Sequence, residues 1–379
     1  MKKIGILAVK THNYGSLLQT YALQKVMDNL GYENEIISYK KTNYFKQALR
    51  LFNLPLLKQT LAKVYKKIYV RIFKPELREL FLKRTVAFNS FTDSLRWSKT
   101  YVGREALEEG SSQYEAFVLG SDQVWNPMNY GADFFSMTFI KKGIKKIAYA
   151  PSFGVSTIPA YQKKGTIKYL SDIDYLSVRE ISGQKLIRKL AGREAKIVVD
   201  PTILLDRKYW DELKGNCLID EPYIMCYFLG ANPHHREFAD KLEKITGYKI
   251  VTLPHMDEIV KSDFVFGDII PQNIGPREFV NLISNASFVC TDSFHGTVFS
   301  ILYKRTFFTF NRYNSSQKDS TNSRLDSILS TVGLESRKVD SSKEITSDML
   351  VSIDYSELDN KLGELRNDSM RFLIDALEA

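Results

Sequence analysis

The chain has 379 residues, of which 44% are hydrophobic and 26% are charged. This composition is ordinary for a protein that buries large cores, and the length predicts two domains. The three cysteines include no C-x-x-C pair and are odd in number, which argues against a disulfide framework. No run of about 18 apolar residues is present, and the first apolar run is too short for a signal peptide. We therefore expect a cytoplasmic protein that does not span a membrane.

The net charge of +9 is concentrated in one segment. Residues 40–84 contain thirteen Lys or Arg and two Glu, a net charge of +11, whereas the rest of the chain carries −2. Between Pro55 and Pro75, apolar residues recur every three or four positions, which predicts a basic amphipathic helix with the stripe Leu57, Leu61, Val64, Ile68 and Ile72. The pattern favours packing of this stripe on the domain, with the basic side chains facing outward. The expected partner is an anionic membrane surface, which would place the protein at the inner face of the membrane; no nucleic acid is expected. The alternative is that the charges only keep an inserted segment soluble.

The chain begins with a β-α-β pattern. Residues 4–9 form a continuous apolar run typical of a buried strand, a helix capped by Ser16 extends to Gly31, and residues 35–39 indicate a second strand. This start is Rossmann-like but lacks G-x-G-x-x-G, which argues against a dinucleotide site. We expect the loop formed by Asn13, Tyr14 and Gly15 to approach an oxygen-rich ligand closely.

A second polar loop follows the apolar strand predicted at residues 116–119. Its sequence, GSDQVWNP, places Asp122, Trp125 and Asn126 just after the strand. Carboxylate, amide and indole groups together suit the hydroxyls and the apolar face of a sugar. The alternative is a capped turn with Trp125 in the core. Further strands are expected at residues 146–150, 175–178 and 196–199, with Arg179 at the end of the middle one.

A second alternation of strands and helices starts after a linker at residues 200–206. Its strands are predicted at residues 223–229, 249–253, 287–290 and 306–310, and its helices at residues 233–246, 276–285, 296–302, 322–332 and 355–377. Such alternation predicts parallel sheets with right-handed crossovers. The expected fold is therefore α/β, with two Rossmann-like domains that face a cleft. We predict an N-terminal domain over residues 1–205, a C-terminal domain over residues 206–350 and a final helix over residues 351–379.

The stretch FVCTDSFHGTVF, residues 288–299, combines a short strand, a polar turn and the start of a helix. Ligands of open α/β sheets bind beyond the carboxyl ends of the strands, where the amides of the next helix carry partial positive charge. His295 lies at that point, where a histidine can hold an anion or move a proton. The alternative is that Asp292 or Ser293 only caps the helix and that His295 is a packed residue.

Several motifs, in this order along the chain, resemble those of the polysaccharide pyruvyl transferase family. They are NYGSLLQTYALQ, LGYE, GSDQVWNP, SVRE, DPT and DSFHGTVFS, and the resemblance covers about residues 3–335 apart from the basic segment. It implies a two-domain fold like that of the GT-B glycosyltransferases. It also implies transfer of a pyruvyl group from phosphoenolpyruvate to a sugar of a polysaccharide or a lipid-linked oligosaccharide, forming a cyclic ketal across two hydroxyls. No metal and no cofactor besides this donor is expected.

The resemblance also implies roles for individual residues. His295 is the candidate general acid or phosphate contact, and Asp292 or Asp122 could take a hydroxyl proton. Several characterised members carry Arg-Leu-His where this chain has Ser293-Phe294-His295, so an arginine is missing, and Arg312 and Arg324 are candidates to replace it. The C-terminal domain would bind the donor, together with Arg179, and the candidate donor residues are Arg179, Ser293, Gly296, Thr297, Arg312 and Arg324. The N-terminal domain would bind the acceptor through Asn13, Tyr14, Gly15, Asp122, Trp125 and Asn126.

Two other functions remain open at this point. A GT-B glycosyltransferase that uses a sugar nucleotide would share the fold and the donor site. A non-catalytic protein that binds anionic glycans or lipid head groups would use the basic segment, and His295 would be dispensable for it.

Overall fold

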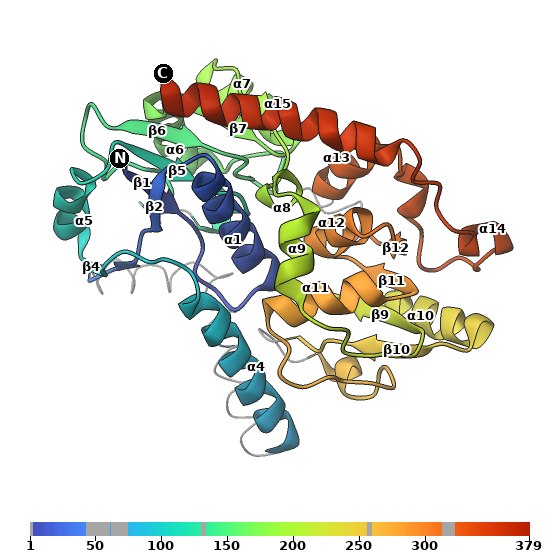
Figure 1. The fold of residues 1–379 in the computed structure, drawn as a ribbon. Helices are drawn as coiled ribbons and strands as arrows, with labels where there is room; N and C mark the ends of the chain where they lie inside the picture. Colours follow the sequence, from blue (N-terminus) through green and yellow to red (C-terminus); the bar gives the residue numbers. More distant parts are fainter. Residues whose placement is uncertain (1–2, 43–60, 62–74, 130–133, 256–259, 313–322) are drawn as a thin grey trace.

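The computed structural model describes residues 3–42, 61, 75–129, 134–255, 260–312 and 323–379. Within these residues the chain forms an α/β fold with two parallel sheets, each flanked by helices (Figure 1). The fold therefore agrees with the expectation of two Rossmann-like domains. The domain boundaries at residues 205 and 350 stay a prediction.

The N-terminal domain is built on a six-stranded sheet with the order β2-β1-β5-β6-β7-β8 in the described part of the chain. Its strands are β1 (Lys3–Leu7), β2 (Glu33–Ile36), β5 (Ala116–Leu119), β6 (Lys145–Ala148), β7 (Tyr175–Val178) and β8 (Lys196–Ile197). The main helices of this domain are α1 (Tyr14–Asn29), α4 (Pro75–Asp93), α5 (Arg104–Ser111), α6 (Ala160–Asp172) and α7 (Ile181–Ala191). A small parallel pair, β3 (Tyr39–Lys40) and β4 (Tyr101–Val102), lies beside this sheet.

The C-terminal domain is built on a four-stranded sheet with the order β10-β9-β11-β12, again counted over described residues. Its strands are β9 (Tyr223–Tyr227), β10 (Lys249–Thr252), β11 (Phe288–Thr291) and β12 (Thr306–Thr309). The accompanying helices are α10 (Pro233–Thr246), α11 (Pro276–Asn285), α12 (Phe294–Leu302), α13 (Ser323–Val332) and α14 (Ser347–Leu350). All strand pairs in both large sheets are parallel, so the carboxyl ends of the strands lie along one edge of each sheet.

The start of α1 corrects one expectation. Asn13, not Ser16, caps the helix: its side chain accepts a hydrogen bond from the Ser16 amide at 3.1 Å. The Ser16 hydroxyl donates instead to Asp122, which lies on the loop after β5. The second predicted cap is present, because the Ser293 hydroxyl accepts from the Gly296 amide and α12 starts at Phe294.

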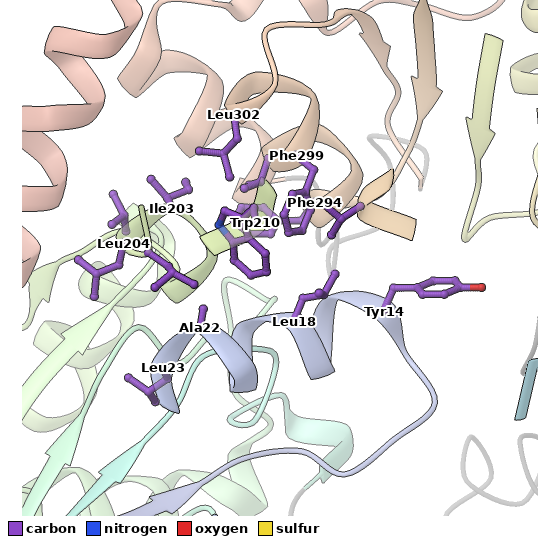
Figure 2. Close-up of a cluster of buried hydrophobic side chains, with 14 of the residues drawn as sticks. Tyr14, Leu18, Ala22, Leu23, Ile203, Leu204, Trp210, Phe294, Phe299 and Leu302 are labelled. Carbon is purple, nitrogen blue, oxygen red and sulfur yellow. The ribbon is translucent and has the colours of Figure 1, made fainter. Parts of the chain in front are cut away.

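The two domains are joined by α8 (Pro201–Leu204) and α9 (Arg207–Lys214), which pack between α1 and α12. Figure 2 shows the apolar cluster that results, with Leu18 and Ala22 on α1 facing Trp210 on α9 and Phe299 on α12. The indole of Trp210 is fully buried, lies edge-on to the Phe299 ring and donates to the Thr202 carbonyl at 3.2 Å. The interface between the domains is therefore a continuous hydrophobic core.

The final helix, α15 (Leu358–Glu378), returns to the N-terminal domain (Figure 1). Ser369 accepts from the Val199 amide at 3.0 Å, and Lys145 donates to the Leu377 carbonyl at 2.9 Å. This helix therefore covers the N-terminal domain although it follows the C-terminal domain in sequence.

The basic segment is described only in part. The amphipathic helix expected between Pro55 and Pro75 lies outside the described residues apart from Leu61, which is exposed. The helix that follows, α4, reaches the C-terminal domain, because the buried Arg84 donates to the Pro254 carbonyl at 2.7 Å. The membrane contact of this segment stays a prediction. Among the helices that the structure describes, none is both long and apolar enough to cross a bilayer.

Replacing Trp210 with Ala tests the importance of the core between the domains. We expect the variant to lose about 3–5 kcal/mol of stability, as is typical when a buried large side chain leaves a cavity. The midpoint of urea unfolding, followed by circular dichroism, measures this loss. Tyr161→Ala is the control, since Tyr161 is 70% exposed. Equal midpoints for the two variants would contradict this assignment.

Candidate functional site

A buried ion pair lies where the two domains meet. Arg179, which follows β7, donates through Nη1 to Asp200 Oδ2 at 2.8 Å, and the side chains are 1% and 0% exposed. The same nitrogen donates to the Ser121 hydroxyl at 3.2 Å. Thr202 binds the other oxygen of Asp200 through its amide and its hydroxyl. Burial alone would raise the pKa of Asp200, but His295, Arg179 and the Thr202 amide hold it well below its usual range.

His295 reaches this ion pair from the C-terminal domain. Its Nε2 lies 3.7 Å from Asp200 Oδ2, which is within the range of an ion pair but too long for a hydrogen bond. The other side of the ring lies against Gly15 on α1, where an added Cβ would be only 1.9 Å from Nδ1. The close approach of Gly15 is therefore to His295, and its expected contact with a ligand stays a prediction.

Asp122 lies beside the same pair, on the loop after β5. Its carboxylate accepts from the Ser16 hydroxyl and lies 3.9 Å from Nη2 of Arg179. Burial raises its pKa, but Arg179, His295 and Ser16 outweigh burial, so the pKa of Asp122 lies below its usual value. The backbone of Asp122 has φ of 85°, a left-handed conformation that costs roughly 1–3 kcal/mol for a residue with a Cβ. Strain of this kind is concentrated at functional sites, and here it places an ionised carboxylate next to Arg179.

Two guanidinium groups lie against Phe294, the first residue of α12, and a third, that of Arg312, is close enough to affect Arg324. Arg179 lies 4.5 Å and Arg324 5.9 Å from the centroid of the Phe294 ring. Arg324 is 7% exposed, and burial together with the charges of Arg179 and Arg312 lowers its pKa to about 9. Crowding of buried cations in this way is unfavourable unless an anion lies between them.

Several nitrogen donors at this point are buried and make no hydrogen bond with any residue in the described part of the chain. They are Nε and Nη2 of Arg179, Nε2 of His295 and Nε of Arg312. Buried polar groups are rarely left without a partner, and a bound ligand is one explanation for those that are. Each of these nitrogens lies 3.7–3.9 Å from a carboxylate without forming a hydrogen bond to it, so its hydrogen-bonding position remains open to an anionic ligand.

Asp292 has a structural environment. Its two carboxylate oxygens accept from the amides of Leu229 and Gly230, at 2.6 and 2.8 Å. His235 Nδ1 lies 3.8 Å away, and Arg312 donates to the Asp292 carbonyl at 3.2 Å. Because both oxygens are already bonded to the backbone, Asp292 is placed to hold the loop after β9 and not to take a proton from a substrate. We correct its expected catalytic role accordingly.

Two aromatic residues expected at the acceptor site lie in hydrophobic cores. The Trp125 ring packs on Phe153, and its indole N–H donates to the Phe135 carbonyl at 3.1 Å. Tyr14 stacks on Phe279 with ring centroids 4.6 Å apart, and its hydroxyl donates to the Ile274 carbonyl. The two side chains are 5% and 3% exposed, so the prediction that they contact a sugar is corrected.

The other residues that were predicted to bind the donor or the acceptor make contacts within their own turns. Asn13 and Asn126 are half-buried, and each side-chain oxygen accepts a backbone amide of its own turn. Ser293 caps α12, and Thr297 donates to the Ser293 carbonyl one turn later, next to Gly296. These contacts hold the start of α12 in place and show no direct part in catalysis. Their roles toward a ligand stay predictions.

Two further residues of the site are not among those predicted from the sequence. Asp200 belongs to the predicted linker, and its Asp-Pro-Thr pattern is also that of a simple helix cap. Glu180, the last residue of the SVRE motif, is fully buried and accepts from the Ser152 hydroxyl and the Phe153 amide. A charged residue next to an apolar strand was the available signal for both.

The chain is similar to one known protein family and to several solved structures. A family model described as polysaccharide pyruvyl transferase matches residues 13–314. A comparison with curated proteins found no match. Among solved structures, the chain is similar to UDP-GlcNAc 2-epimerase from Neisseria meningitidis bound to UDP-GlcNAc, with 9% identity, a TM-score of 0.52 and coverage of 100% of this chain and 99% of that chain.

Two further solved structures match with lower scores. UDP-N-acetylglucosamine 2-epimerase from Rickettsia bellii has 10% identity and a TM-score of 0.48, with coverage of 99% of this chain and 96% of that chain. ADP-heptose lps heptosyltransferase II of E. coli has 10% identity and a TM-score of 0.38, with coverage of 97% and 99%.

At such low identity, the solved structures show the GT-B-like fold and nothing about chemistry. The family model is different in kind, because it matches the sequence itself over most of the chain, including the loops that carry Asp122, Arg179 and His295. The chain therefore belongs to the polysaccharide pyruvyl transferase family.

Proposed function

We propose that this protein transfers a pyruvyl group from phosphoenolpyruvate to two hydroxyls of a sugar and so forms a cyclic ketal. The observation that supports this proposal is the group of three guanidiniums, Arg179, Arg312 and Arg324, gathered beside His295 at the domain interface. Phosphoenolpyruvate carries a carboxylate and a phosphate, and guanidinium groups bind both in bidentate geometry. The cluster would thus hold the donor and supply the charge of the arginine that is missing at Ser293.

The reaction requires a proton at the methylene carbon of the donor. His295 is the candidate general acid, because its Nε2 has no hydrogen-bond partner among described residues and lies 3.7 Å from Asp200, the partner of Arg179. Protonation creates an electron-poor carbon, to which one sugar hydroxyl adds. The second hydroxyl then displaces phosphate, whose leaving charge the arginines stabilise.

The proton balance assigns a part to Asp122. The two hydroxyls of the acceptor lose two protons; one replaces the proton donated to carbon, and the other leaves with phosphate. Asp122 is ionised and partly exposed, so it can accept a hydroxyl proton, whereas Asp292 is already bonded to two amides. Asp200 is buried; its carboxylate lies 3.7 Å from Nε2 of His295 and 2.8 Å from Nη1 of Arg179, so it positions both side chains.

Thermal unfolding with and without phosphoenolpyruvate tests the anion site. We expect the donor to raise the melting temperature, because it binds only the folded protein and neutralises crowded cations. The increase should become much smaller in Arg324→Gln. Arg188→Gln is the control, since Arg188 is exposed on the last turn of α7. Equal stabilisation of both variants would contradict the proposed position of the donor.

The fate of the methylene carbon distinguishes this function from its rivals. In heavy water, we expect the ketal methyl group of the product to carry one deuterium, detected by NMR, with release of one phosphate per ketal. His295→Gln should fold normally and lose about 10²–10⁴-fold in rate, the typical contribution of a general acid. His234→Gln, on the surface of α10, should keep full activity.

Two other results would contradict part or all of this proposal. Turnover of a sugar nucleotide in place of phosphoenolpyruvate would assign the protein to the glycosyltransferases that share its fold. Full activity of folded His295→Gln would leave the transfer intact but remove this histidine from the reaction.

Replacing Asp200 with Asn tests the part assigned to this carboxylate. The change keeps the shape of the side chain but removes the negative charge next to His295 and Arg179. We expect a lower rate of ketal formation, with the secondary structure seen by circular dichroism unchanged. Asp206→Asn, which alters the equivalent cap of α9, is the control. A wild-type rate in folded Asp200→Asn would show that Asp200 is only structural.

A further inference from the structure

A groove separate from the arginine cluster lies between α7 of the N-terminal domain and α13 of the C-terminal domain. It has a volume of about 330 Å³. This value is at the lower end of the range of roughly 300–1,000 Å³ for small-molecule sites, so the groove can hold about one sugar unit. Much of its wall is apolar, and four of its lining residues carry hydroxyl groups: Ser182, Ser323, Ser327 and Ser330.

Both walls of the groove continue into the candidate active site. Ser182 lies three residues after Arg179, at the start of α7, and Ser323 directly precedes Arg324 at the start of α13. The hydroxyls of Ser182 and Ser323 lie 3.3 Å apart across the domain interface. A substrate that reacts beside Arg179 and Arg324 can therefore extend along these residues into the groove.

The chemistry of the groove differs from that of the arginine cluster. Ser323, Ser327 and Ser330 are spaced by four and three residues, which places them on one face of α13. A serine hydroxyl both donates and accepts, as a sugar hydroxyl does. Ile181, which is 44% exposed, adds an apolar surface for the face of a sugar ring.

The charges lining the groove disfavour an anion. Lys338 forms an ion pair with Asp326, and Glu335 adds a further negative charge. A carboxylate or phosphate would gain no net attraction here, in contrast to the site beside His295. The groove is therefore suited to an uncharged molecule rich in hydroxyls.

We infer that this groove binds an uncharged sugar unit of the acceptor, adjacent to the unit that receives the pyruvyl group. This inference rests on the proposed function, because that function places the reacting sugar beside His295. It makes the acceptor an oligosaccharide or polysaccharide and not a free monosaccharide. It also assigns part of acceptor recognition to the C-terminal domain, through α13.

Titration calorimetry with neutral glucan, mannan and galactan fragments, from monosaccharide to tetrasaccharide, tests the inference. We expect at least one series to bind more tightly as it lengthens, with phosphoenolpyruvate present. Ser327→Trp fills the groove and should weaken binding of the trisaccharide by about tenfold or more, equivalent to about 1.4 kcal/mol. Binding of the monosaccharide and of phosphoenolpyruvate should not change. Ser171→Trp, at an exposed serine of α6, is the matched control.

Three results would overturn the inference. They are the absence of binding by every series, equal affinity for short and long fragments, and unchanged binding in Ser327→Trp. A polygalacturonate fragment that binds in the groove more tightly than the neutral series would contradict the inference that the bound sugar unit is uncharged. Phosphoenolpyruvate turnover is measured separately, so loss of the proposed function and loss of this groove give different results.

Discussion

The contact between His295 and Gly15 determines how the two domains meet. The imidazole at the start of α12 lies directly on the backbone of α1, where any side chain larger than hydrogen would collide with it. This contact brings His295 within 3.7 Å of Asp200, which already holds Arg179. A single charged group thus contains Arg179 of the N-terminal domain, Asp200 of the linker and His295 of the C-terminal domain. The hydrophobic core around Trp210 supports it, since the packing of α1, α9 and α12 fixes the distance between the domains.

The burial of this group explains its electrostatic character. Asp122, Asp200 and Glu180 balance part of the positive charge, yet Arg324 still experiences Arg179 and Arg312 as unfavourable neighbours. In a medium of low polarity, such an imbalance is stronger than it would be at the surface. The proposed donor, an anion with two charged ends, would relieve this imbalance, so the site would gain binding energy at some cost in the stability of the protein without it.

The sequence predicted the regular elements better than the site. Strand β5 and helices α10 and α11 lie where their apolar patterns placed them, because periodic burial is a local property of a sequence. Tyr14 and Trp125 were misassigned because nothing local distinguishes an aromatic ring on a ligand from one in a core; their partners, Phe279 and Phe153, are distant in sequence. Asp200 shows the same limit: it caps α8 as its sequence indicates, but its contacts with Arg179 and His295 depend on the assembled fold.

The return of α15 to the N-terminal domain has a consequence for the autonomy of the two halves. The chain passes between the domains twice, once through α8 and α9 and once on the way to α15, so the N-terminal domain is not a continuous piece of sequence. A fragment cut at the linker would lose the helix that packs on Tyr149 and Val199, and would expose the apolar surface beneath it. Both ends of the chain, by contrast, lie on the same domain (Figure 1). A circular permutant that joins these ends and opens the chain in an exposed loop would keep every contact described here, whereas separately produced halves would not.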